Sequence, residues 1–311
     1  MAGKGIVLGI DLGGTKIAAG IFDSERRLMG EIATVPTQAD QPGQATLGNL
    51  KRVAGAACGR AGAGGGRLLA VGIGSTGPVE SSTGRVLEAT SLPNLNFFDL
   101  GAWVRAEFDA PLFLENDANC FALGEALQGA GAGHPAVVAV TLGTGFGCGM
   151  VIDGVMYAGT TGNAGEVANC PVAGDTFDNM LSGAGVRRFY ERVRGEPSPL
   201  SAREIGDLAE RGDGTALRAW HEYGDAVGSA LGTVAAVLDP SICVIGGSVA
   251  ARFALFEEPL RERLRSILAP AAAVRMQVAL ARLGPAAGVI GAAEYAFYRL
   301  RIEGRDQSAS L

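Results

Sequence analysis

Three polar residues, Glu115, Asn116 and Asp117, stand where an apolar run meets a helical pattern in LENDAN, residues 114–119. As structure, Asp117 would be a helix N-cap or an acid stabilised by the helix dipole. As chemistry, a carboxylate at such a junction accepts a proton from a sugar hydroxyl while the hydroxyl oxygen attacks a phosphoryl group. Asn116 supplies both a donor and an acceptor, which suits a polyol. The motif alone favours the capping interpretation, so the rest of the chain has to decide.

Two turns that contain glycine and threonine add chemistry that suits phosphate. DLGGTK, residues 11–16, ends an apolar strand, and TLGTGFGCG, residues 141–149, repeats the pattern later in the chain. Glycines let backbone N–H groups approach phosphate oxygens closely, and a threonine hydroxyl adds a donor. Asp11 could hold Mg2+ through water, although a β-turn with a capping Asp explains the first motif equally well. The two loops together favour phosphate binding.

A glycine pair follows a third apolar strand in ICVIGGSVA, residues 242–250. In open α/β sheets ligands lie beyond the carboxyl ends of strands, so Gly246 and Gly247 mark a place for the adenosine of a nucleotide. Tight packing explains such a pair as well. The sequence contains no Walker A loop, and no G-x-G-x-x-G opens a helix after a strand, so P-loop and Rossmann interpretations are weak.

The elements that must position these motifs begin with three strands over residues 5–35. A helix is expected over about residues 43–60, and the glycine-rich loop GRAGAGGGR separates it from an apolar strand, LLAVGIG. A helix between strands implies a parallel crossover. PLFLEN reads as a further strand, followed by a helix. GVIGAAEYAFYRLRIEG reads as a final helix that could pack on the first domain.

The second half of the chain repeats the opening pattern. AVVAVTLGTG is a strand with a Gly-Thr-Gly turn, and CGMVIDGVMYAG is a hairpin whose Asp153-Gly154 pair suits a two-residue turn. This architectural repeat predicts two related α/β domains with a cleft between them. The domains are expected over residues 1–116 with about 290–311, and over residues 117–289.

Composition excludes several classes of protein. The 311 residues carry a net charge of -6 with a pI near 5.1, which argues against non-specific binding to nucleic acid or to an anionic membrane. Two stretches nearly free of charge approach the length of a membrane span, but glycines interrupt one and Asp239-Pro240 interrupts the other. No signal peptide is visible, so a cytoplasmic protein is expected. Five scattered cysteines read as reduced thiols, and the two histidines, His134 and His221, leave little for a structural zinc site. The cysteines are Cys58, Cys120, Cys148, Cys170 and Cys243.

The ordered set of motifs resembles the ROK family of bacterial sugar kinases, in the actin/hexokinase-like superfamily. The resemblance runs over about residues 5–297 and rests on DLGGTK, GSTGPVE, SLPNL, LENDAN, LGTGFGCG, the AGE of AGEVAN, and VIGGSVA. It implies an α/β fold of two actin-like (RNase H-like) domains. The helix-turn-helix that precedes this core in the family's repressors is not seen before the first strand, which favours the kinase branch.

The resemblance also implies roles for individual residues. Asp117 is expected to be the catalytic base, and Glu166 the acid that binds hydroxyls near the anomeric carbon. Lys16 matches the first motif, but a solvated strand lysine fits it as well. The other expected sugar contacts are Gly77, Asn94 and Asn116. The two phosphate loops comprise Asp11, Gly13, Gly14 and Thr15, and Gly143, Thr144 and Gly145, with Gly246 and Gly247 in the adenosine segment.

This sequence departs from the family pattern at the sugar wall. The usual G-E-x-G-H reads GEVAN, so Ala168 and Asn169 replace Gly and His. The family's cysteine-rich zinc loop is replaced by PVAGDTFDNMLSG, which puts Asp178 where a sugar-binding Glu would be. Zinc is therefore not expected. Packing would have to hold this wall, with Asn169 and Asp178 as hydrogen-bonding groups.

Together these features predict an enzyme that uses ATP and Mg2+ to phosphorylate a hexose or amino-hexose, and the family resemblance implies a homodimer. A sugar-sensing protein without turnover is the alternative that the altered GEVAN and the missing zinc loop favour. A third possibility is phosphoryl transfer to a non-sugar polyol, or from polyphosphate.

Overall fold

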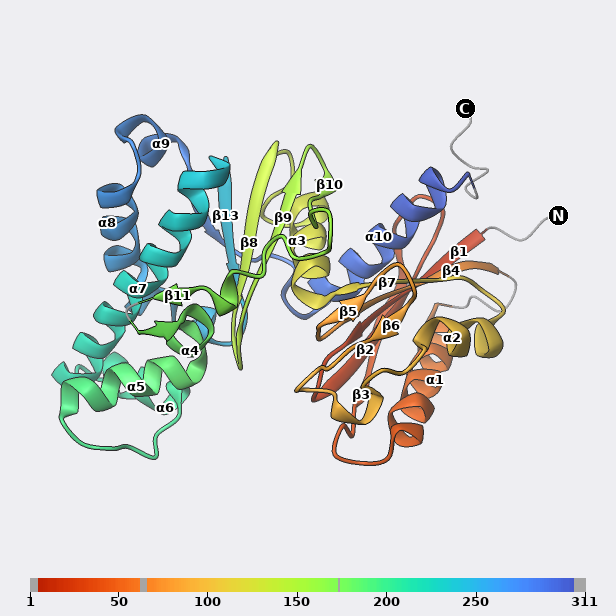
Figure 1. Ribbon diagram of the computed structural model, residues 1–311, viewed down its shortest axis with the longest axis horizontal. Coiled ribbons are helices and arrows are strands. Elements are labelled where there is room, and N and C mark those ends of the chain that lie inside the picture. The colour runs from red at the N-terminus through yellow and green to blue at the C-terminus, as the bar shows by residue number, and fades with distance from the viewer. Residues whose placement is uncertain (1–4, 62–65, 173, 305–311) are drawn as a thin grey trace. The chain divides into compact units, whose positions relative to one another are not determined.

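The structure is a computed structural model that describes residues 5–61, 66–172 and 174–304 (Figure 1). Residues 62–65 of the predicted loop GRAGAGGGR, Ala173 of the predicted sugar wall, and residues 305–311 of the predicted first domain lie outside the described residues. The chain divides into two compact units. Unit 1 is Met1–Gly124 with Pro285–Leu311, and unit 2 is Glu125–Gly284. The observed division falls at 124/125 and 284/285, whereas the sequence placed it at 116/117 and near 290.

Unit 1 is built on a mixed five-stranded sheet. The strand order is β3-β2-β1-β4-β7, with β1, β4 and β7 parallel and β2 antiparallel to both β1 and β3. The strands are β1 (Gly5–Leu12), β2 (Lys16–Phe22), β3 (Leu28–Pro36), β4 (Arg67–Ser75) and β7 (Leu112–Asn116). Shorter elements are β5 (Val79–Glu80), β6 (Arg85–Val86) and η1 (Pro93–Leu95). Because β1, β4 and β7 run parallel, their carboxyl ends share one edge of the sheet, where the predicted site residues of this unit begin.

Helices cover this sheet because strand side chains alternate between its two faces. Leu8 and Ile10 of β1 join a buried cluster with Leu50 of helix α1 (Gly43–Arg60). Helix α2 (Leu100–Phe108) adds Leu100 and Val104 to the same cluster. Helix α10 (Ala287–Ile302) packs on β1, β4 and β7, so the last helix returns to the first unit as predicted.

Glycines let α10 approach the sheet closely. A Cβ on Gly72 would lie 2.0 Å from the carbonyl oxygen of Ala292, and one on Gly9 would lie 2.4 Å from that of Val289. Contacts that short do not occur, so glycine is required at both places. The runs GIVLGID and AVGIG therefore contain glycine for helix packing as well as for turns.

Unit 2 repeats the topology of unit 1. Its sheet has the order β10-β9-β8-β13-β14, with β8, β13 and β14 parallel and β9 antiparallel to β8 and β10. The strands are β8 (Ala136–Leu142), β9 (Phe146–Ile152), β10 (Val155–Met156), β13 (Ile242–Gly246) and β14 (Gln277–Leu280). Asp153 and Gly154 join β9 to β10 with φ angles of 50° and 75°, as a two-residue turn with two positive φ values requires. The repeat predicted from the sequence is confirmed at the level of strand order.

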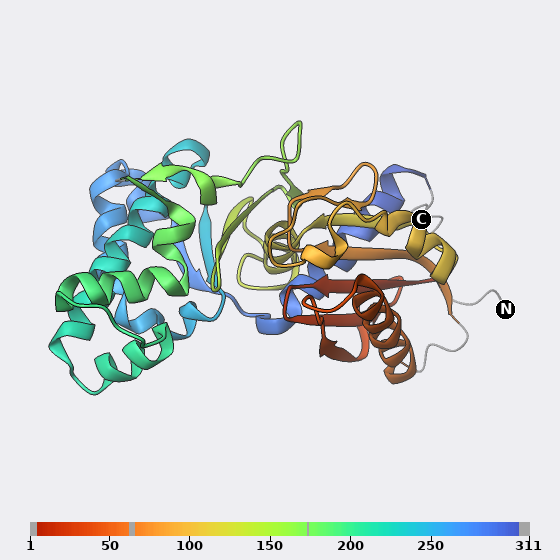
Figure 2. The same cartoon turned by 60° about the horizontal axis from the view of Figure 1, so that its bottom comes forward.

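Helices make up most of the rest of unit 2 and lie together beside its sheet (Figure 2). They are α4 (Phe177–Leu181), α5 (Gly183–Arg194), α6 (Ala202–Glu210), α7 (Gly214–Leu238), α8 (Glu257–Ile267) and α9 (Pro270–Arg275). Their core includes Trp220 stacked on Phe256, with ring centroids 5.8 Å apart. After β13 the chain forms the 3-10 helix η3 (Val249–Leu255), where the sequence suggested an ordinary helix.

Helix α3 (Asp117–Gln128) begins directly after β7, and the boundary between the units falls within it. The chain returns to unit 1 at the short η4 (Gly284–Ala286). Among the residues that the structure describes, no helix is both long and apolar enough to cross a bilayer.

Candidate active site

The β7–α3 junction of unit 1 holds the predicted base. The Asn116 Oδ1 atom accepts hydrogen bonds from the backbone N–H groups of Ala118 at 2.8 Å and Asn119 at 3.4 Å. Asn116 therefore caps α3, and Asp117 is the first helical residue rather than the cap. The Asp117 carboxylate accepts a hydrogen bond from the N–H of Ala118 at 2.8 Å. The capping task is filled by its neighbour, which leaves the chemical interpretation of Asp117 open.

Gly77 lies against this junction. A Cβ on Gly77 would be 2.9 Å from Asn116 Nδ2, and the Gly77–Pro78 peptide bond is cis. In the parallel register, Ser75 at the end of β4 pairs with Asn116 at the end of β7. Three of the residues predicted to act on a sugar, Gly77, Asn116 and Asp117, thus lie together at one edge of the sheet.

Asn94 occupies η1 and ties two loops together. Its Nδ2 donates to the backbone oxygens of Gln38 at 3.3 Å and Gln41 at 2.9 Å, and to Thr46 Oγ1 at 2.9 Å. Its buried Oδ1 has no hydrogen-bond partner among the described residues.

The first predicted phosphate loop is a tight connection between β1 and β2. The Gly13 N–H donates to the Lys16 carbonyl at 3.1 Å, and Thr37 Oγ1 donates to the Gly13 carbonyl at 2.6 Å. A Cβ on Gly14 would lie 2.4 Å from the carbonyl oxygen of Ser91 in the SLPNL segment. The loop is therefore fixed against that segment, with Thr15 and Lys16 exposed on it.

Asp11 is a carboxylate held close to a helix. A Cβ on Gly288, near the start of α10, would lie 2.9 Å from Asp11 Cγ, so glycine makes room for the acid. Burial raises the pKa of Asp11, and the charge of Lys16 partly opposes this rise. Burial, and then the charges of Glu115, Asp11 and Asp117, also raise the pKa of the Cys120 thiol well above its ordinary value. Glu115, Asp11 and Asp117 therefore all lie near Cys120.

These carboxylates suit a hydrated Mg2+ better than a metal held by protein ligands alone. In the described part of the chain, no group of three His, Cys, Asp or Glu side chains is placed to hold a metal ion. Mg2+ usually keeps several waters and binds one or two carboxylates together with substrate phosphates. Asp11, which is the penultimate residue of β1 and borders the predicted phosphate loop, fits that way of binding.

The second predicted phosphate loop, in unit 2, is braced by Asp178. The N–H of Phe146 donates to Asp178 Oδ1 at 2.7 Å, and the N–H of Gly183 donates to the Gly143 carbonyl at 2.8 Å. A Cβ on Gly145 would lie 2.9 Å from Asp178 Oδ1. Asp178 was predicted from its place in the sequence as a sugar contact, and the structure shows it holding this loop in shape.

GEVAN forms a turn against β9. Gly165 has a φ of 90°, and a Cβ there would lie 2.5 Å from the Cys148 carbonyl oxygen. Glu166 precedes η2 (Val167–Asn169), and both Glu166 and Asn169 are exposed. Burial, and next the charge of Glu166, raise the pKa of Cys148 to about 12. The retained glycine therefore places Glu166 beside the strand, and Asn169 follows one turn later.

A small hairpin stands where the family's zinc loop would be. Strands β11 (Pro171–Val172) and β12 (Asp175–Thr176) pair and lead into α4. Asp175 accepts hydrogen bonds from Asn179 Nδ2 at 2.7 Å and from Arg188 Nη1 at 3.1 Å. Arg188 also donates to the Asn179 carbonyl at 3.3 Å. Hydrogen bonds and an ion pair thus join the hairpin, α4 and α5.

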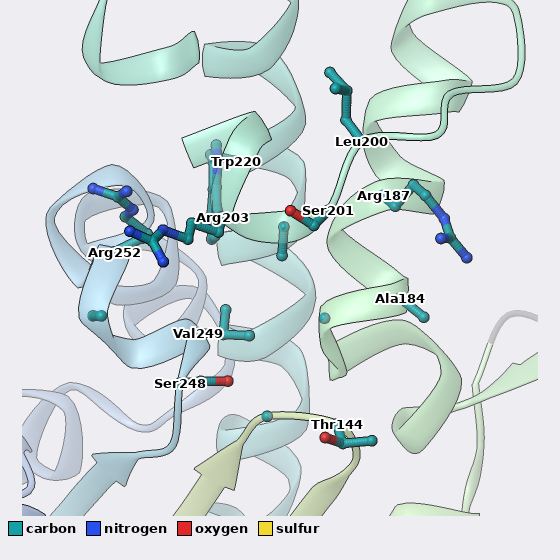
Figure 3. Close-up of a pocket in the computed structure, with 14 residues that line it drawn as sticks. Thr144, Ala184, Arg187, Leu200, Ser201, Arg203, Trp220, Ser248, Val249 and Arg252 are labelled. Atoms are coloured by element: carbon teal, nitrogen blue, oxygen red, sulfur yellow. The ribbon is translucent and has the colours of Figure 1, made fainter. Parts of the chain in front are cut away.

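Unit 2 also contains a cavity of about 710 Å³. Thr144 and Ser248 lie at one end of it, and Leu200 and Trp220 lie at the other (Figure 3). The second phosphate loop and the segment after Gly246 and Gly247 are therefore brought to one pocket. Gly247 has a φ of 90°, and a Cβ there would lie 2.3 Å from the carbonyl oxygen of Leu142, the last residue of β8. The glycine pair therefore turns the chain tightly after β13, close to the end of β8.

Most of the cavity lining escaped the sequence prediction. Arg187, Ser201, Arg203, Trp220 and Arg252 come from α5, α6, α7 and η3 and the turns beside them. Arg252 forms ion pairs with Asp207 and Glu210 of α6. No local signal distinguishes these side chains, because each sits in an ordinary amphipathic segment. The remaining lining residues are Gly143, Gly183, Ala184, Ala202, Val249 and Ala251.

Two α/β units of identical strand order, each with a Gly-Thr loop after its first strand, define an actin-like two-domain protein. The model of the ROK family matches residues 7–298, and the chain belongs to that family.

Its relatives include sugar kinases. N-acetyl-D-glucosamine kinase of Shigella flexneri is 34% identical over 305 residues, covering 92% of this chain and 97% of that kinase. The ROK hexokinase of Thermus thermophilus is 30% identical, with a TM-score of 0.81 over 96% of this chain and 99% of the other. A ROK glucokinase of Streptomyces griseus, solved with glucose and AMPPNP, is 29% identical, with a TM-score of 0.75 over 93% of this chain and 98% of the other.

Proposed function

We propose that this protein is an ATP- and Mg2+-dependent kinase that phosphorylates a hydroxyl of a hexose or amino-hexose. The observation that carries the proposal is the grouping of Gly77, Asn116 and Asp117 at the ends of β4 and β7. A carboxylate at the first position of α3, beside an amide whose Oδ1 caps the helix and whose Nδ2 is a donor, suits a sugar hydroxyl that must lose its proton. The kinase names of the relatives support the same activity.

The sugar would be held mainly through hydroxyl hydrogen bonds. Asn116 would donate through Nδ2, since its Oδ1 caps α3, and Asn94 is expected to contribute from η1. Glu166, Asn169 and Asp178 would form a second set of contacts from unit 2. Asn169 donates and accepts, so it can replace a histidine toward a hydroxyl without metal.

The nucleotide would be held by phosphate loops and by the cavity of unit 2. Thr144 lies at the end of that cavity, which suits phosphate, and the far end with Leu200 and Trp220 suits a base. The N–H groups of Gly13 and Gly143 are engaged within the two predicted phosphate loops. Gly14 and Thr15 of the first loop, and Thr144 and Gly145 of the second, would supply the backbone N–H donors. Mg2+, when bound with Asp11 through water, neutralises negative charge on the phosphate oxygens.

The chemical step follows from these placements. Asp117 accepts the proton of the attacking hydroxyl as the sugar oxygen forms a bond to the γ-phosphorus. The bond between the γ-phosphorus and the bridging oxygen breaks, and ADP leaves with that oxygen. Water must be excluded while this happens, since it is a competing nucleophile present in great excess.

Substitution of the base tests the proposal. Asp117→Ala should lower the rate of ADP release with hexoses and N-acetylhexosamines by about 10²- to 10⁴-fold, while nucleotide binding stays close to that of the unaltered protein. Asp225→Ala, which removes an exposed carboxylate of α7 near Arg263, is the control and should keep its rate. Near-full activity of Asp117→Ala would contradict the assignment.

A sugar sensor without turnover is the second candidate. It is favoured by the replacement of the family's Gly and His by Ala168 and Asn169, and by the bond that already engages Asp178. This candidate would be supported if calorimetry showed sugar binding while no sugar caused release of ADP from ATP. Replacing ATP by polyphosphate tests the remaining donor alternative, with the sugar phosphate measured as the product because no ADP forms. As a kinase it would act in the cytoplasm, where ATP is available, and light scattering would test for the homodimer that the family suggests.

A further inference from the structure

Glu115 is a buried acid that the proposed reaction does not use. It is the penultimate residue of β7 and pairs in register with Gly74 of β4. Its relative exposure is 5%, yet none of the described cationic side chains forms an ion pair with it. A buried carboxylate without a cation is expensive unless hydrogen bonds satisfy it. The groups that donate hydrogen bonds to Glu115 should therefore explain why a carboxylate is buried at this place.

The Glu115 carboxylate holds both sides of the catalytic junction. Oε1 accepts the backbone N–H of Asn116 at 2.8 Å and Nδ2 of Asn119 at 3.0 Å. Oε2 accepts Ser81 Oγ at 3.4 Å, from the segment that follows Gly77 and Pro78. Asn116 is the cap of α3 and Asn119 lies in its first turn, so the two residues flank Asp117 in the chain. One carboxylate thus links the cap, the first turn and the loop that carries Gly77.

Tyr295 lies behind this network. Burial, and next the charge of Glu115, raise the pKa of Tyr295 to about 12. Arg299 Nη1 donates to the Tyr295 hydroxyl at 3.0 Å. Both residues belong to α10, which packs on β7, so the junction is supported from the sheet side by a helix far away in the sequence.

We propose that Glu115 is a positioning residue that aligns Asp117 with the sugar hydroxyl. The inference rests on the proposed kinase function. Without Glu115, the Asn116 N–H and the Asn119 amide would lose their acceptor, and the first turn of α3 would be free to shift. A displacement of about 1 Å at a reacting group costs on the order of 10²-fold in rate.

Two substitutions separate positioning from charge. Glu115→Ala removes the acceptor and should lower kcat about 10- to 100-fold, while the KM for ATP, whose cavity lies in unit 2, stays within about threefold. Glu115→Gln keeps an oxygen for Asn116 and Asn119 and offers an N–H to Ser81, so it should keep more than about a third of kcat. Glu294→Gln is the control, because it neutralises another buried acid of unit 1, with a relative exposure of 4%, and should leave kcat unchanged.

If Glu115→Ala does not fold, Asn119→Ala still tests the positioning role, since it removes only one hydrogen-bond donor to Glu115. It should lower kcat about 3- to 10-fold with the KM for ATP unchanged. A kcat within threefold of the unaltered protein for Glu115→Ala or Asn119→Ala, or a Glu115→Gln variant as slow as Glu115→Ala, would overturn the positioning role alone. Absence of ADP release by the unaltered protein with every sugar would overturn the kinase function as well.

Discussion

Asp11 bears an electrostatic penalty that its predicted function explains. Burial disfavours its charged form, and Lys16 offsets only part of this effect. Residues that bind metal-phosphate complexes must be charged when the ligand arrives, so the folded protein carries the penalty in the absence of ligand. A neutral side chain of the same shape would remove the penalty together with the function.

Asp11→Asn should therefore make the protein more stable and less active. Because the pKa of Asp11 is raised in the folded state, its ionisation opposes folding, and this opposition is absent below the ordinary value near 3.8 and complete above the raised pKa. The variant should melt about 1–3 °C higher near pH 8, and the difference should shrink as the pH falls toward 4. Thermal unfolding over this pH range measures the effect.

Asp99→Asn gives the opposite sign and serves as the control. The hydrogen bond from the Ala102 N–H lowers the pKa of Asp99, so its charged form is favoured in the folded protein. The same substitution there should lower the melting temperature near pH 8. If the melting temperatures of both variants shifted in the same direction, removal of the burial penalty at Asp11 would not be the cause of the change.

At the scale of elements, the β11–β12 hairpin and α4 form the segment that was predicted from the sequence to be part of the sugar wall. Asp175 is the centre of the arrangement, and the hydrogen bonds from Asn179 and Thr176 lower its pKa, with a smaller contribution from Arg188. Thr176 also caps α4, the helix whose Asp178 braces the second phosphate loop. The hairpin that follows Asn169 is thus connected to that loop through residues 175–178, because Asp175 belongs to the hairpin and Asp178 binds the loop.

Arg188→Ala should loosen this wall and weaken sugar binding. The ion pair is partly exposed, with side-chain exposures of 49% and 37%, so its effect is modest. We expect the KM for the sugar to rise about two- to fivefold, with the KM for ATP unchanged, because Arg188 does not line the unit 2 cavity. Steady-state kinetics with each substrate varied in turn measures the difference.

Arg192→Ala is the matched control on the same helix. Arg192 forms a comparable surface ion pair with Glu222, away from the hairpin. Its loss should leave the KM for the sugar unchanged. Equal effects from both arginines would mean that general loosening of α5, rather than the hairpin, controls the sugar site.

The sequence predicts the elements well where local patterns suffice. The helix expected over residues 43–60 is α1, and the Asp153-Gly154 turn is confirmed, because helical periodicity and turn chemistry are properties of neighbouring residues. The two-domain α/β class is confirmed because the repeated motifs fix the strand order. Gly77 and Asn116 meet because Gly77 lies two residues after β4 and Asn116 ends β7, and these two strands are parallel neighbours.

Features that depend on distant partners were not predictable. Nothing in LENDAN reveals that Glu115 reaches Ser81, since that contact needs β4, β5 and β7 assembled. Nor does any local pattern bring Arg203 and Trp220 to the cavity that holds Thr144. The assignment of Asp178 from motif spacing also missed its bond to Phe146, which crosses 32 residues of sequence.

At the scale of the whole molecule, the predicted site residues are divided between the two units. Gly77, Asn94, Asn116 and Asp117 belong to unit 1, and Glu166, Asn169 and Asp178 belong to unit 2. The nucleotide residues are divided in the same way, with Asp11 in unit 1 and the cavity in unit 2. Phosphoryl transfer requires the sugar hydroxyl and the γ-phosphorus to meet, so the proposed activity would need residues of both units.

This division predicts that sugar and nucleotide bind cooperatively. A substrate that engages residues of both units orders them for the second substrate, which then binds more tightly. We expect a non-hydrolysable ATP analogue with Mg2+ to raise sugar affinity about 5- to 100-fold in calorimetry, and the sugar to raise analogue affinity by the same factor, as linkage requires. Asp117→Ala, which removes the proposed base alone, should keep most of this coupling. Independent binding of the two ligands would mean that each unit binds its substrate without the other, and the division of residues would then have no consequence for catalysis.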